Sequence, residues 1–289
     1  MSFLIYIIAY PFLWVISKLP FRLLYMFSDL VFFILFYLIR YRRKTVRKNL
    51  KIALPNLSDS EHSRIEKEFY RHMCDMFLEM IKTLGITESE MRKHFTFTNI
   101  EVIHEFEKKG KSIILMCAHY ASWEWMIIIG KLINIKGFGI YKKIKNPYFD
   151  KLVRDIRSKF DATLIDTKST VKQVTENQKN GVQGIYAFIS DQTPRPQKTH
   201  YWESFMGKVV PIHTGGEMLA KKLDMNVIYL KVEKLKRGHY QGTFIPLAEN
   251  VREIPDYEIT HDFLKEVEKQ IHQKPEYYFW THKRWKHKI

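Results

Sequence analysis

A histidine and a glutamate, His119 and Glu124, stand five positions apart in the stretch CAHYASWEW, residues 117–125. This spacing does not suit an i,i+4 pair on one helix, so we expect His119 on a turn and Glu124 in the first turns of the next helix. A carboxylate that accepts a hydrogen bond from one imidazole nitrogen leaves the other free to take a proton from an alcohol. The pair therefore predicts a general base, His119, oriented by Glu124.

Two simpler interpretations compete with this chemistry. An H-x4-E pattern is short and occurs by chance, so spacing alone favours a histidine that caps a helix beside a surface glutamate. Cys117 stands two residues before His119 and is a candidate nucleophile, but a thiol in apolar surroundings with no nearby cation is inert. The chain has only one other cysteine, Cys74, which indicates a reducing compartment without a disulfide framework.

The elements that would position these residues alternate between strands and helices from residue 111 onward. Strands are expected at SIILMC, GFGIY, ATLID, GIYAFIS and NVIYLKV, with helices at SWEWMIIIGKLI, YFDKLVRDIRSKF, STVKQVTENQKN, GGEMLAKKL and YEITHDFLKEVEKQIHQ. This alternation predicts an α/β fold, a mostly parallel sheet flanked by helices. The strand HYQGTFIPL follows a turn at KLKRG, and we expect this last hairpin to add an antiparallel edge.

Parallel strands bring their carboxyl ends to one edge of a sheet, which is where ligands bind in open α/β sheets. His119 comes just after SIILMC, and Asp191 comes just after GIYAFIS. Arg157, on the helix before ATLID, is expected to reach the same crevice.

The N-terminal region is the most apolar part of the chain. Residues 3–39 form two apolar runs separated by KLPFR, and Asp29 lies within the second. A helix needs about 20 apolar residues to span a bilayer, so we expect either one short span or two helices embedded in one leaflet. The start has no basic region and no small-residue cleavage site of a secretory signal.

The net charge of +16 implies an anionic partner. The basic run RYRRKTVRKNLK directly follows the apolar region. This position favours contact with anionic membrane lipids and places the remainder of the chain on the cytoplasmic side. The alternative is a charged face that is merely solvated. We therefore predict a membrane-anchoring segment, residues 1–44, and a catalytic domain, residues 45–289. Ser58 and Glu61 have capping-box spacing before an amphipathic helix that ends at Gly85.

Several blocks together resemble one enzyme family. HYASWEW resembles the H-x4-D/E block of glycerolipid acyltransferases, without the E-G-T-R block of the phosphatidic-acid-forming branch. The chain as a whole is similar to the late acyltransferases of lipid A biosynthesis, the lauroyl/myristoyl transferases. The blocks are YRRKTVRKNLKIALPNLS, HYASWEW, YKKIKNPYFDKLVRDIRSKF, SDQTPRP, FMGKVVPIHTGGEMLAKKLDMNVI and KPEYYFWTHKRWK.

The resemblance implies roles for particular residues. His119 and Glu124 match the catalytic dyad, and Arg157 matches the arginine of the NP…R block. Four further positions match blocks expected at the substrate site, Asp191, Gln192, Gly207 and Thr214. Family members often have glycine-rich residues after the DQ pair, whereas TPRPQK follows here.

The same resemblance implies the reaction and its setting. An acyl chain would move from a thioester, on acyl-carrier protein or acyl-CoA as co-substrate, to a hydroxyl of a glycolipid, the lipid A precursor. We expect no metal, no cofactor and no nucleic-acid partner, and a location at the bacterial inner membrane. One alternative is an acyltransferase acting on another amino lipid or phospholipid. The other is a membrane-tethered nucleic-acid-binding protein, suggested by the net charge and by THKRWKHK. Against the second alternative, common nucleic-acid motifs are missing.

A cationic stretch suggests where an acidic carrier protein would bind. Residues 131–159 hold nine basic and two acidic residues. They follow the helix of Glu124 and include the helix of Arg157. Charge complementarity therefore predicts docking of the carrier on this stretch.

Overall fold

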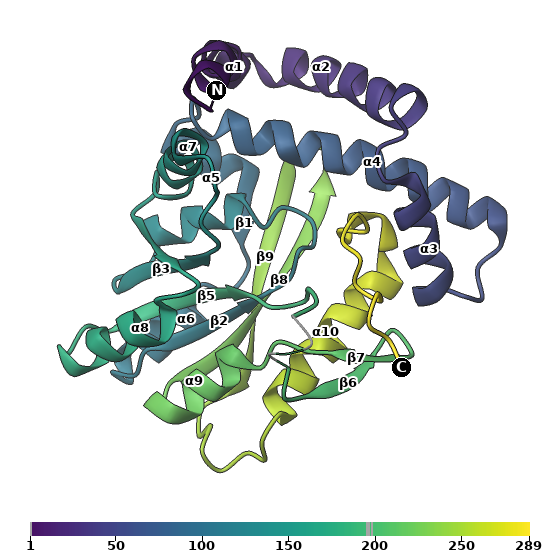
Figure 1. Cartoon of the computed structure of the whole chain (residues 1–289). Helices are drawn as coiled ribbons and strands as arrows, with labels where there is room; N and C mark the ends of the chain where they lie inside the picture. Colours follow the sequence, from purple (N-terminus) through teal and green to yellow (C-terminus); the bar gives the residue numbers. More distant parts are fainter. Residues whose placement is uncertain (1, 195–196, 198) are drawn as a thin grey trace.

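A computed structural model describes residues 2–194, 197 and 199–289. Over these residues the chain forms a seven-stranded sheet in the order β1-β9-β8-β2-β5-β3-β4 (Figure 1). The strands are β1 (Phe95–Phe97), β2 (Ile113–Cys117), β3 (Lys136–Tyr141), β4 (Ala162–Asp166), β5 (Gly184–Ile189), β8 (Asn226–Lys236) and β9 (His239–Ala248). The predicted α/β fold with a mostly parallel sheet is confirmed.

One pair of neighbouring strands, β8 and β9, is antiparallel, and it is joined by the two-residue turn Arg237–Gly238. The expectation that this hairpin forms an edge is wrong, because β1 pairs in parallel with β9 and lies outside it. β1 has only three residues, which is too short to give a recognisable alternation of apolar and polar positions.

Helices cover both faces of the sheet. In Figure 1, α8 (Thr170–Lys179), α9 (Gly215–Leu223) and α10 (Glu258–Gln273) lie below it. Above it lie α4 (Asp59–Lys82), α5 (Glu88–His94) and α7 (Pro147–Arg157). The remaining elements of the catalytic region are α3 (Arg43–Ala53), α6 (Glu101–Lys108) and the short 3₁₀-helices η2 (Trp125–Lys131) and η4 (Pro275–Tyr277). The helix expected after Glu124 is therefore a single 3₁₀ segment.

The long helix α4 begins where its sequence predicts. The Ser58 side chain accepts from the Glu61 amide, and the Glu61 carboxylate accepts from the Ser58 amide at 2.8 Å. This capping box satisfies two backbone groups that a helix start leaves unpaired. Ile65, Phe69 and Met73 are buried in the hydrophobic core, so this face of the amphipathic helix packs inward.

The N-terminal helices α1 (Ser2–Lys18) and α2 (Phe21–Phe33) lie along α4, and α2 continues as the π-helical turn η1 (Ile34–Leu38) (Figure 1). Phe21–Leu38 is long and apolar enough to cross a membrane, with a mean hydropathy of 1.8. The outer surface of α1 and α2 exposes large apolar side chains, among them Ile8, Phe12, Met26 and Leu30. The predicted boundary after residue 44 falls in the first turn of α3 and stays a prediction.

The inner face of α2 is polar and fixed to the rest of the molecule. Tyr25 donates to Glu79 at 2.8 Å, and Ser28 donates to Asp75 at 2.7 Å. Asp29 accepts from Arg237 of the β8–β9 turn at 2.7 Å. Because residues 25, 28 and 29 share one helical face, α2 presents a protein-binding side and an apolar side.

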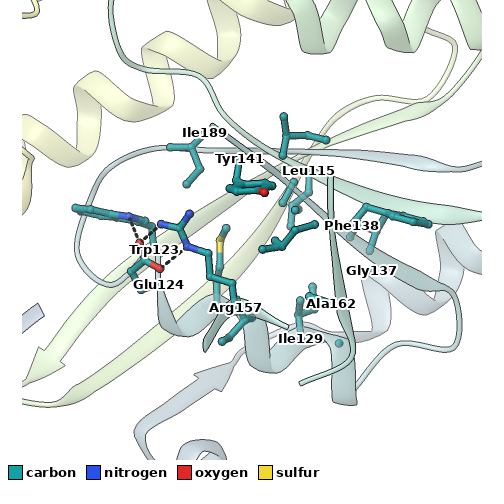
Figure 2. A pocket seen from close by; sticks show the side chains of 18 residues that line it. Leu115, Trp123, Glu124, Ile129, Gly137, Phe138, Tyr141, Arg157, Ala162 and Ile189 are labelled. Carbon is teal, nitrogen blue, oxygen red and sulfur yellow. Dashed lines mark hydrogen bonds and ion pairs between the residues drawn. The ribbon is translucent and has the colours of Figure 1, made fainter. Parts of the chain in front are cut away.

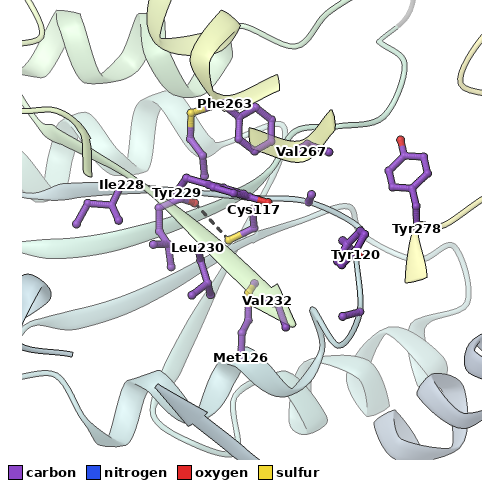
Figure 3. Packing of buried hydrophobic residues seen from close by; sticks show 14 of the residues in the cluster. Cys117, Tyr120, Met126, Ile228, Tyr229, Leu230, Val232, Phe263, Val267 and Tyr278 are labelled. Atoms are coloured by element: carbon purple, nitrogen blue, oxygen red, sulfur yellow. Dashed lines mark hydrogen bonds between the residues drawn. The ribbon is translucent and has the colours of Figure 1, made fainter. Parts of the chain in front are cut away.

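The core lies beneath the carboxyl end of β2. Cys117 packs there with Tyr229 of β8 and Phe263 of α10 (Figure 3). Burial raises the pKa of the Cys117 thiol, and the charge of Asp191 raises it further. The thiol is therefore protonated at neutral pH, which supports its interpretation as an inert core residue.

Candidate active site

The two strands β2 and β5 place His119 opposite Asp191. Cys117 and Ile189 are partners in the parallel register of these strands, so the residues two positions beyond each are also brought together. The Nδ1 of His119 donates to Oδ1 of Asp191 at 2.8 Å, and the His119 amide donates to the same oxygen at 2.9 Å. The carboxylate thus fixes the imidazole tautomer and leaves Nε2 free.

Burial and charge act against each other on Asp191. The side chain is only 1% exposed, and burial alone would raise its pKa. The neighbouring imidazole and the amide hydrogen bond outweigh that effect, so the pKa of Asp191 lies below its usual value. Asp191 is therefore a carboxylate at neutral pH and an acceptor for His119.

Glu124 has a different partner from the one its spacing predicts. Its carboxylate accepts from Nε and Nη2 of Arg157 at 2.9 and 2.5 Å, and from the Trp123 indole at 3.2 Å. Both His119 and Glu124 are described by the structure, and their side chains share no hydrogen bond. The predicted orientation of His119 by Glu124 is thus corrected, because the strand register puts Asp191 on the imidazole instead.

The Glu124–Arg157 pair occupies one end of an apolar cavity (Figure 2). Phe138 and Ala162 lie at the opposite end from the ion pair (Figure 2). Residues of β3, β4 and β5 line one part of the cavity, and residues of η2 line another. The empty volume of the cavity, including its open mouth, is about 700 Å³. Apart from the ion pair, the lining suits hydrocarbon.

The aromatic residue Trp123 connects the cavity to His119. Its ring lines the cavity and lies 5.0 Å from the imidazole, centroid to centroid. The loop between them is held in an unusual conformation, because Ala121 has a φ of 49°. Non-glycine residues rarely adopt this left-handed region unless the surrounding structure enforces it. His72 donates from Nε2 to the Ala121 carbonyl at 3.3 Å and supplies part of that constraint.

The remaining predicted site residues lie at three different places. Gln192 directly follows Asp191 and is half-buried. Gly207 is in the turn between β6 (Trp202–Phe205) and β7 (Lys208–Pro211), with a φ of 68°. The left-handed turn explains a glycine here without any ligand. Thr214 precedes the first residue of α9, as expected, and within the described part of the chain no hydrogen bond links it to His119.

The C-terminal segment 277–285 forms a wall against the catalytic loop. The Ala121 amide donates to the Tyr277 carbonyl at 3.0 Å, and the Phe279 amide donates to the His119 carbonyl at 3.1 Å. The Phe279 ring lies 6.1 Å from the imidazole. These two backbone hydrogen bonds hold the loop of His119 and Ala121 in a fixed position relative to this segment.

Two side chains that sequence reasoning missed hold the wall in place. Asn49 of α3 donates to the carbonyls of Trp280 and His282, each at 2.7 Å. Arg284, only 1% exposed, donates to the Pro211 carbonyl at 3.1 Å. Thr193 donates to the Arg284 carbonyl at 2.7 Å. The sequence signal for Asn49 was its inward position on the amphipathic helix α3, whereas Arg284 was hidden in a basic tail.

The sequence model described as "Bacterial lipid A biosynthesis acyltransferase" matches residues 2–287. The chain belongs to this family. It is 23% identical over 278 residues to the lipid A biosynthesis lauroyltransferase of Escherichia coli K12, covering 95% of this chain and 89% of that protein. It is 20% identical over 243 residues to the lipid A biosynthesis myristoyltransferase of the same organism, covering 82% and 73%. It is also 20% identical over 244 residues to a lipid A biosynthesis acyltransferase of Haemophilus influenzae, covering 83% and 74%.

Membership assigns the chain acyltransferase activity in lipid A biosynthesis and confirms the resemblance found in its motifs. For a lipid A acyltransferase, a histidine with one free nitrogen beside an apolar cavity has a direct chemical use. Within residues 2–194, 197 and 199–289, no group of three or more His, Cys, Asp or Glu side chains is placed to hold a metal ion. The expectation of metal-free chemistry stays a prediction.

Proposed function

We propose that this acyltransferase moves a fatty acyl chain from the thioester of acyl-carrier protein to a hydroxyl of a lipid A precursor, with His119 as general base. The observation that carries the proposal is the Asp191 bond to Nδ1, which leaves Nε2 unprotonated and able to accept a proton. His119 is 20% exposed, so an acceptor hydroxyl has access to it.

The proposed reaction needs no covalent enzyme intermediate. Nε2 of His119 takes the hydroxyl proton while the acceptor oxygen bonds to the thioester carbonyl carbon. The tetrahedral intermediate collapses, the carbon–sulfur bond breaks, and the thiolate leaves and receives the proton from His119. Asp191 holds the ring and stabilises the imidazolium that forms between these steps.

Arg157 suits the stabilisation of negative charge on the thioester oxygen. Burial alone would lower its pKa, but the Glu124 carboxylate outweighs burial and raises it. Nε and Nη2 are engaged by Glu124, and Nη1 retains its donors for the carbonyl oxygen. In this proposal Glu124 fixes the guanidinium at the cavity mouth, where electrostatic preorganisation is most effective.

The apolar cavity is the proposed place for the acyl chain. Its glycine-containing strand β3 contributes Gly137 and Gly139 to the lining, which leaves width that larger side chains would fill. Met126 also lines the cavity, and its unbranched thioether changes rotamer easily, so the lining can adjust to a chain.

The carrier protein is proposed to dock at the loop after β3. Lys142, Lys143 and Lys145 are exposed there, and Tyr141 just before them lines the cavity. An acidic carrier bound to these lysines would present its thioester at the mouth. In this proposal the cationic stretch 131–159 attracts the acidic carrier, and the bound carrier then delivers its acyl chain to the cavity.

We also propose that the enzyme sits on the cytoplasmic face of the inner membrane, with α1 and α2 embedded in one leaflet. The polar side of α2 is bonded to α4 and to Arg237, so it is unavailable to lipid. The apolar side is exposed and would enter the leaflet, while the basic run 40–51 would contact anionic headgroups.

Reconstitution with purified components tests the proposal. Wild-type protein in detergent or vesicles is given acyl-carrier thioester and lipid A precursor, and products are identified by mass spectrometry. We expect a product heavier by one acyl chain, and lipid A from cells without the protein should be lighter by one chain. Transfer to a phospholipid or amino lipid but not to the precursor would contradict the proposed acceptor.

A further inference from the structure

A second cavity lies between α2, α4, the β8–β9 turn and η4, and it is polar. The empty volume of this cavity, including its open mouth, is about 1050 Å³. Charged side chains dominate its lining, which includes Asp29, Arg71, Asp75, Lys234, Glu276 and the ring of Tyr277. None of the site residues predicted from the sequence lines it, although Glu276 and Tyr277 belong to the block KPEYYFWTHKRWK.

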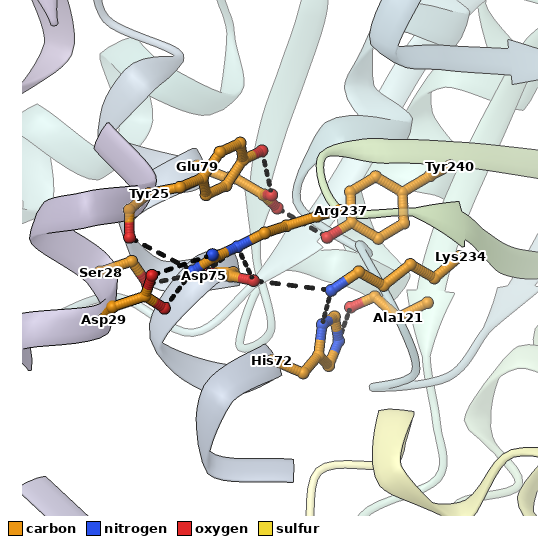
Figure 4. Close-up of polar contacts among 10 residues, drawn as sticks. All are labelled: Tyr25, Ser28, Asp29, His72, Asp75, Glu79, Ala121, Lys234, Arg237 and Tyr240. Atoms are coloured by element: carbon orange, nitrogen blue, oxygen red, sulfur yellow. Dashed lines mark hydrogen bonds and ion pairs between the residues drawn. The ribbon is translucent and has the colours of Figure 1, made fainter. Parts of the chain in front are cut away.

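Some of these charges neutralise one another. Figure 4 shows Arg237 between the carboxylates of Asp29 and Asp75, with nitrogen–oxygen distances of 2.7 Å to each. Lys234 lies 3.6 Å from Asp75 and 3.3 Å from Nδ1 of His72. These contacts tie α2, α4 and the β8–β9 turn together, so the cavity has a rigid wall.

Two opposite charges in the lining have no such partners. Arg71 stacks on the ring of Phe32 at 5.2 Å, and within the described part of the chain it makes no ion pair. Glu276 is 8% exposed and, among the same residues, its carboxylate makes no ion pair or hydrogen bond. Both groups face the cavity, where a ligand can reach them. The arrangement therefore indicates a ligand that supplies hydrogen-bond donors to Glu276 and negative charge to Arg71.

The cavity shares a wall with the catalytic loop. Tyr277 lines the cavity, and its carbonyl accepts from Ala121, two residues after His119. Phe279, two residues after Tyr277, lies 6.1 Å from the imidazole, ring centroid to ring centroid. A ligand beside Tyr277 is therefore separated from the His119 loop by one short segment of chain.

The cavity also lies at the membrane-facing side of the molecule. Asp29 and Phe32 of α2 line it, while Met26, Leu30 and Phe33 of the same helix are exposed. A lipid whose chains remain beside the apolar face of α2 would bring its headgroup to the level of the cavity. Soluble metabolites would gain nothing from this placement.

We propose that this cavity binds the phosphorylated sugar headgroup of the acceptor glycolipid, with Arg71 on the phosphate and Glu276 on sugar hydroxyls. This inference rests on the proposed acyl transfer to a lipid A precursor. A guanidinium suits phosphate, because it donates parallel hydrogen bonds to two oxygens. The Tyr277 ring offers a flat apolar surface for a sugar face. A purely anionic ligand would leave Glu276 unpaired, and a purely cationic ligand would leave Arg71 unpaired.

The test compares Arg71→Ala and Glu276→Gln with wild-type protein and with Lys172→Ala, an exposed lysine of α8 that lies outside the cavity. Initial rates are measured at varied precursor and saturating acyl-carrier thioester. We expect KM for the precursor to rise about 10–100-fold in Arg71→Ala, the loss typical of a charge-assisted phosphate contact, with a smaller change in kcat. Lys172→Ala should match wild type.

Two further measurements separate the possible failures. Thioester hydrolysis without acceptor requires the catalytic loop only, so it reports whether each variant is intact. The fully deacylated, phosphorylated lipid A disaccharide should inhibit wild-type transfer and inhibit Arg71→Ala much less, and glycerophosphoethanolamine should inhibit neither. Unchanged KM and unchanged inhibition in both variants would overturn the headgroup site. Equal inhibition by glycerophosphoethanolamine would overturn the sugar assignment. Wild-type protein that hydrolyses thioester but never acylates the precursor would instead overturn the proposed function.

Discussion

The two cavities beside the His119 loop differ in nearly every respect. The cavity reached through Trp123 is lined by apolar side chains, with Glu124 and Arg157 as its charged pair. The cavity reached through Tyr277 is larger and lined mainly by charged groups. In the proposed reaction, which joins a hydrocarbon chain to a sugar, each environment suits one of the two substrates. The difference indicates that His119 stands where an apolar and a polar binding region meet.

The largest loss of activity is expected from substitution of His119, because both cavities adjoin its loop. His119→Ala should lower acyl transfer by about 10²–10⁴-fold, because the proposed mechanism uses His119 to take the acceptor proton. Asp191→Asn should also lower kcat strongly, because an amide no longer fixes the Nδ1–H tautomer. Glu124→Gln serves as the contrast, since its carboxylate contacts Arg157 and not His119. A larger kcat loss in Glu124→Gln than in Asp191→Asn would reverse the assigned roles.

Substitutions of Arg157 test the mouth of the apolar cavity. Arg157→Ala should lower kcat by about 10²–10³-fold if its guanidinium meets the developing oxyanion. Arg157→Lys keeps the charge but loses the paired contact with Glu124, so it should recover only part of the rate. Steady-state rates with saturating donor and acceptor measure both. Loss confined to KM for the donor would assign Arg157 to binding alone.

The far end of the apolar cavity should set the length of the acyl chain. Ala162→Leu places three extra carbons in the lining, so the ratio of kcat/KM for a shorter chain to that for a longer chain should rise about tenfold. Competing carrier thioesters of graded length, analysed by mass spectrometry, give this ratio directly. Val171→Leu, at an exposed position of α8, is the control. An unchanged chain preference would show that the acyl chain lies elsewhere.

The lysines outside this cavity should affect encounter with the donor. Reversal of Lys142, Lys143 and Lys145 to glutamate should lower kcat/KM for acyl-carrier protein about tenfold at low salt, with little change in kcat. The difference from wild type should shrink as salt screens the charges. Acyl-CoA provides a donor without the carrier surface. If carrier kinetics and their salt dependence match wild type, the carrier docks on another face.

The smallest expected effect is on the pH dependence of protein stability, through a buried carboxyl group near the polar cavity. Burial raises the pKa of Glu79 to about 7, from 4.5 in an exposed chain, although Tyr240 donates to it. Between these values the folded state holds the extra proton, so the free energy of unfolding falls as pH rises from about 4.5 to 7. Glu79→Gln should flatten this dependence, measured as Tm at pH 5 and pH 8. An equally steep decline in the variant would assign the pH dependence to other groups.

The sequence predicted which residues meet at the edge of the sheet, but not how they pair. Strand patterns alone placed His119 and Asp191 after β2 and β5. That these strands are neighbours, in the register Cys117 to Ile189, is decided by packing of the whole sheet. Glu124 therefore looked like the partner of His119, because it is closer in sequence.

Other misses have similar physical causes. The segment after Glu124 has helical periodicity, but it forms only the 3₁₀ turn η2, since periodicity does not distinguish one helix type from another. The polar cavity draws residues from positions 29 to 277, and no local motif connects them. Arg284 belongs to a tail whose charge suggested an exposed surface, whereas the fold buries it.

The C-terminal wall has a consequence for biosynthesis of the enzyme. Segment 277–285 supplies the backbone bonds to His119 and Ala121, while Asn49, near the other end of the chain, anchors it. Translation delivers α1 and α2 before this segment. A growing chain therefore carries its apolar helices before it has the backbone support of its catalytic loop. The active site becomes ordered only when segment 277–285 has been made and has packed against that loop.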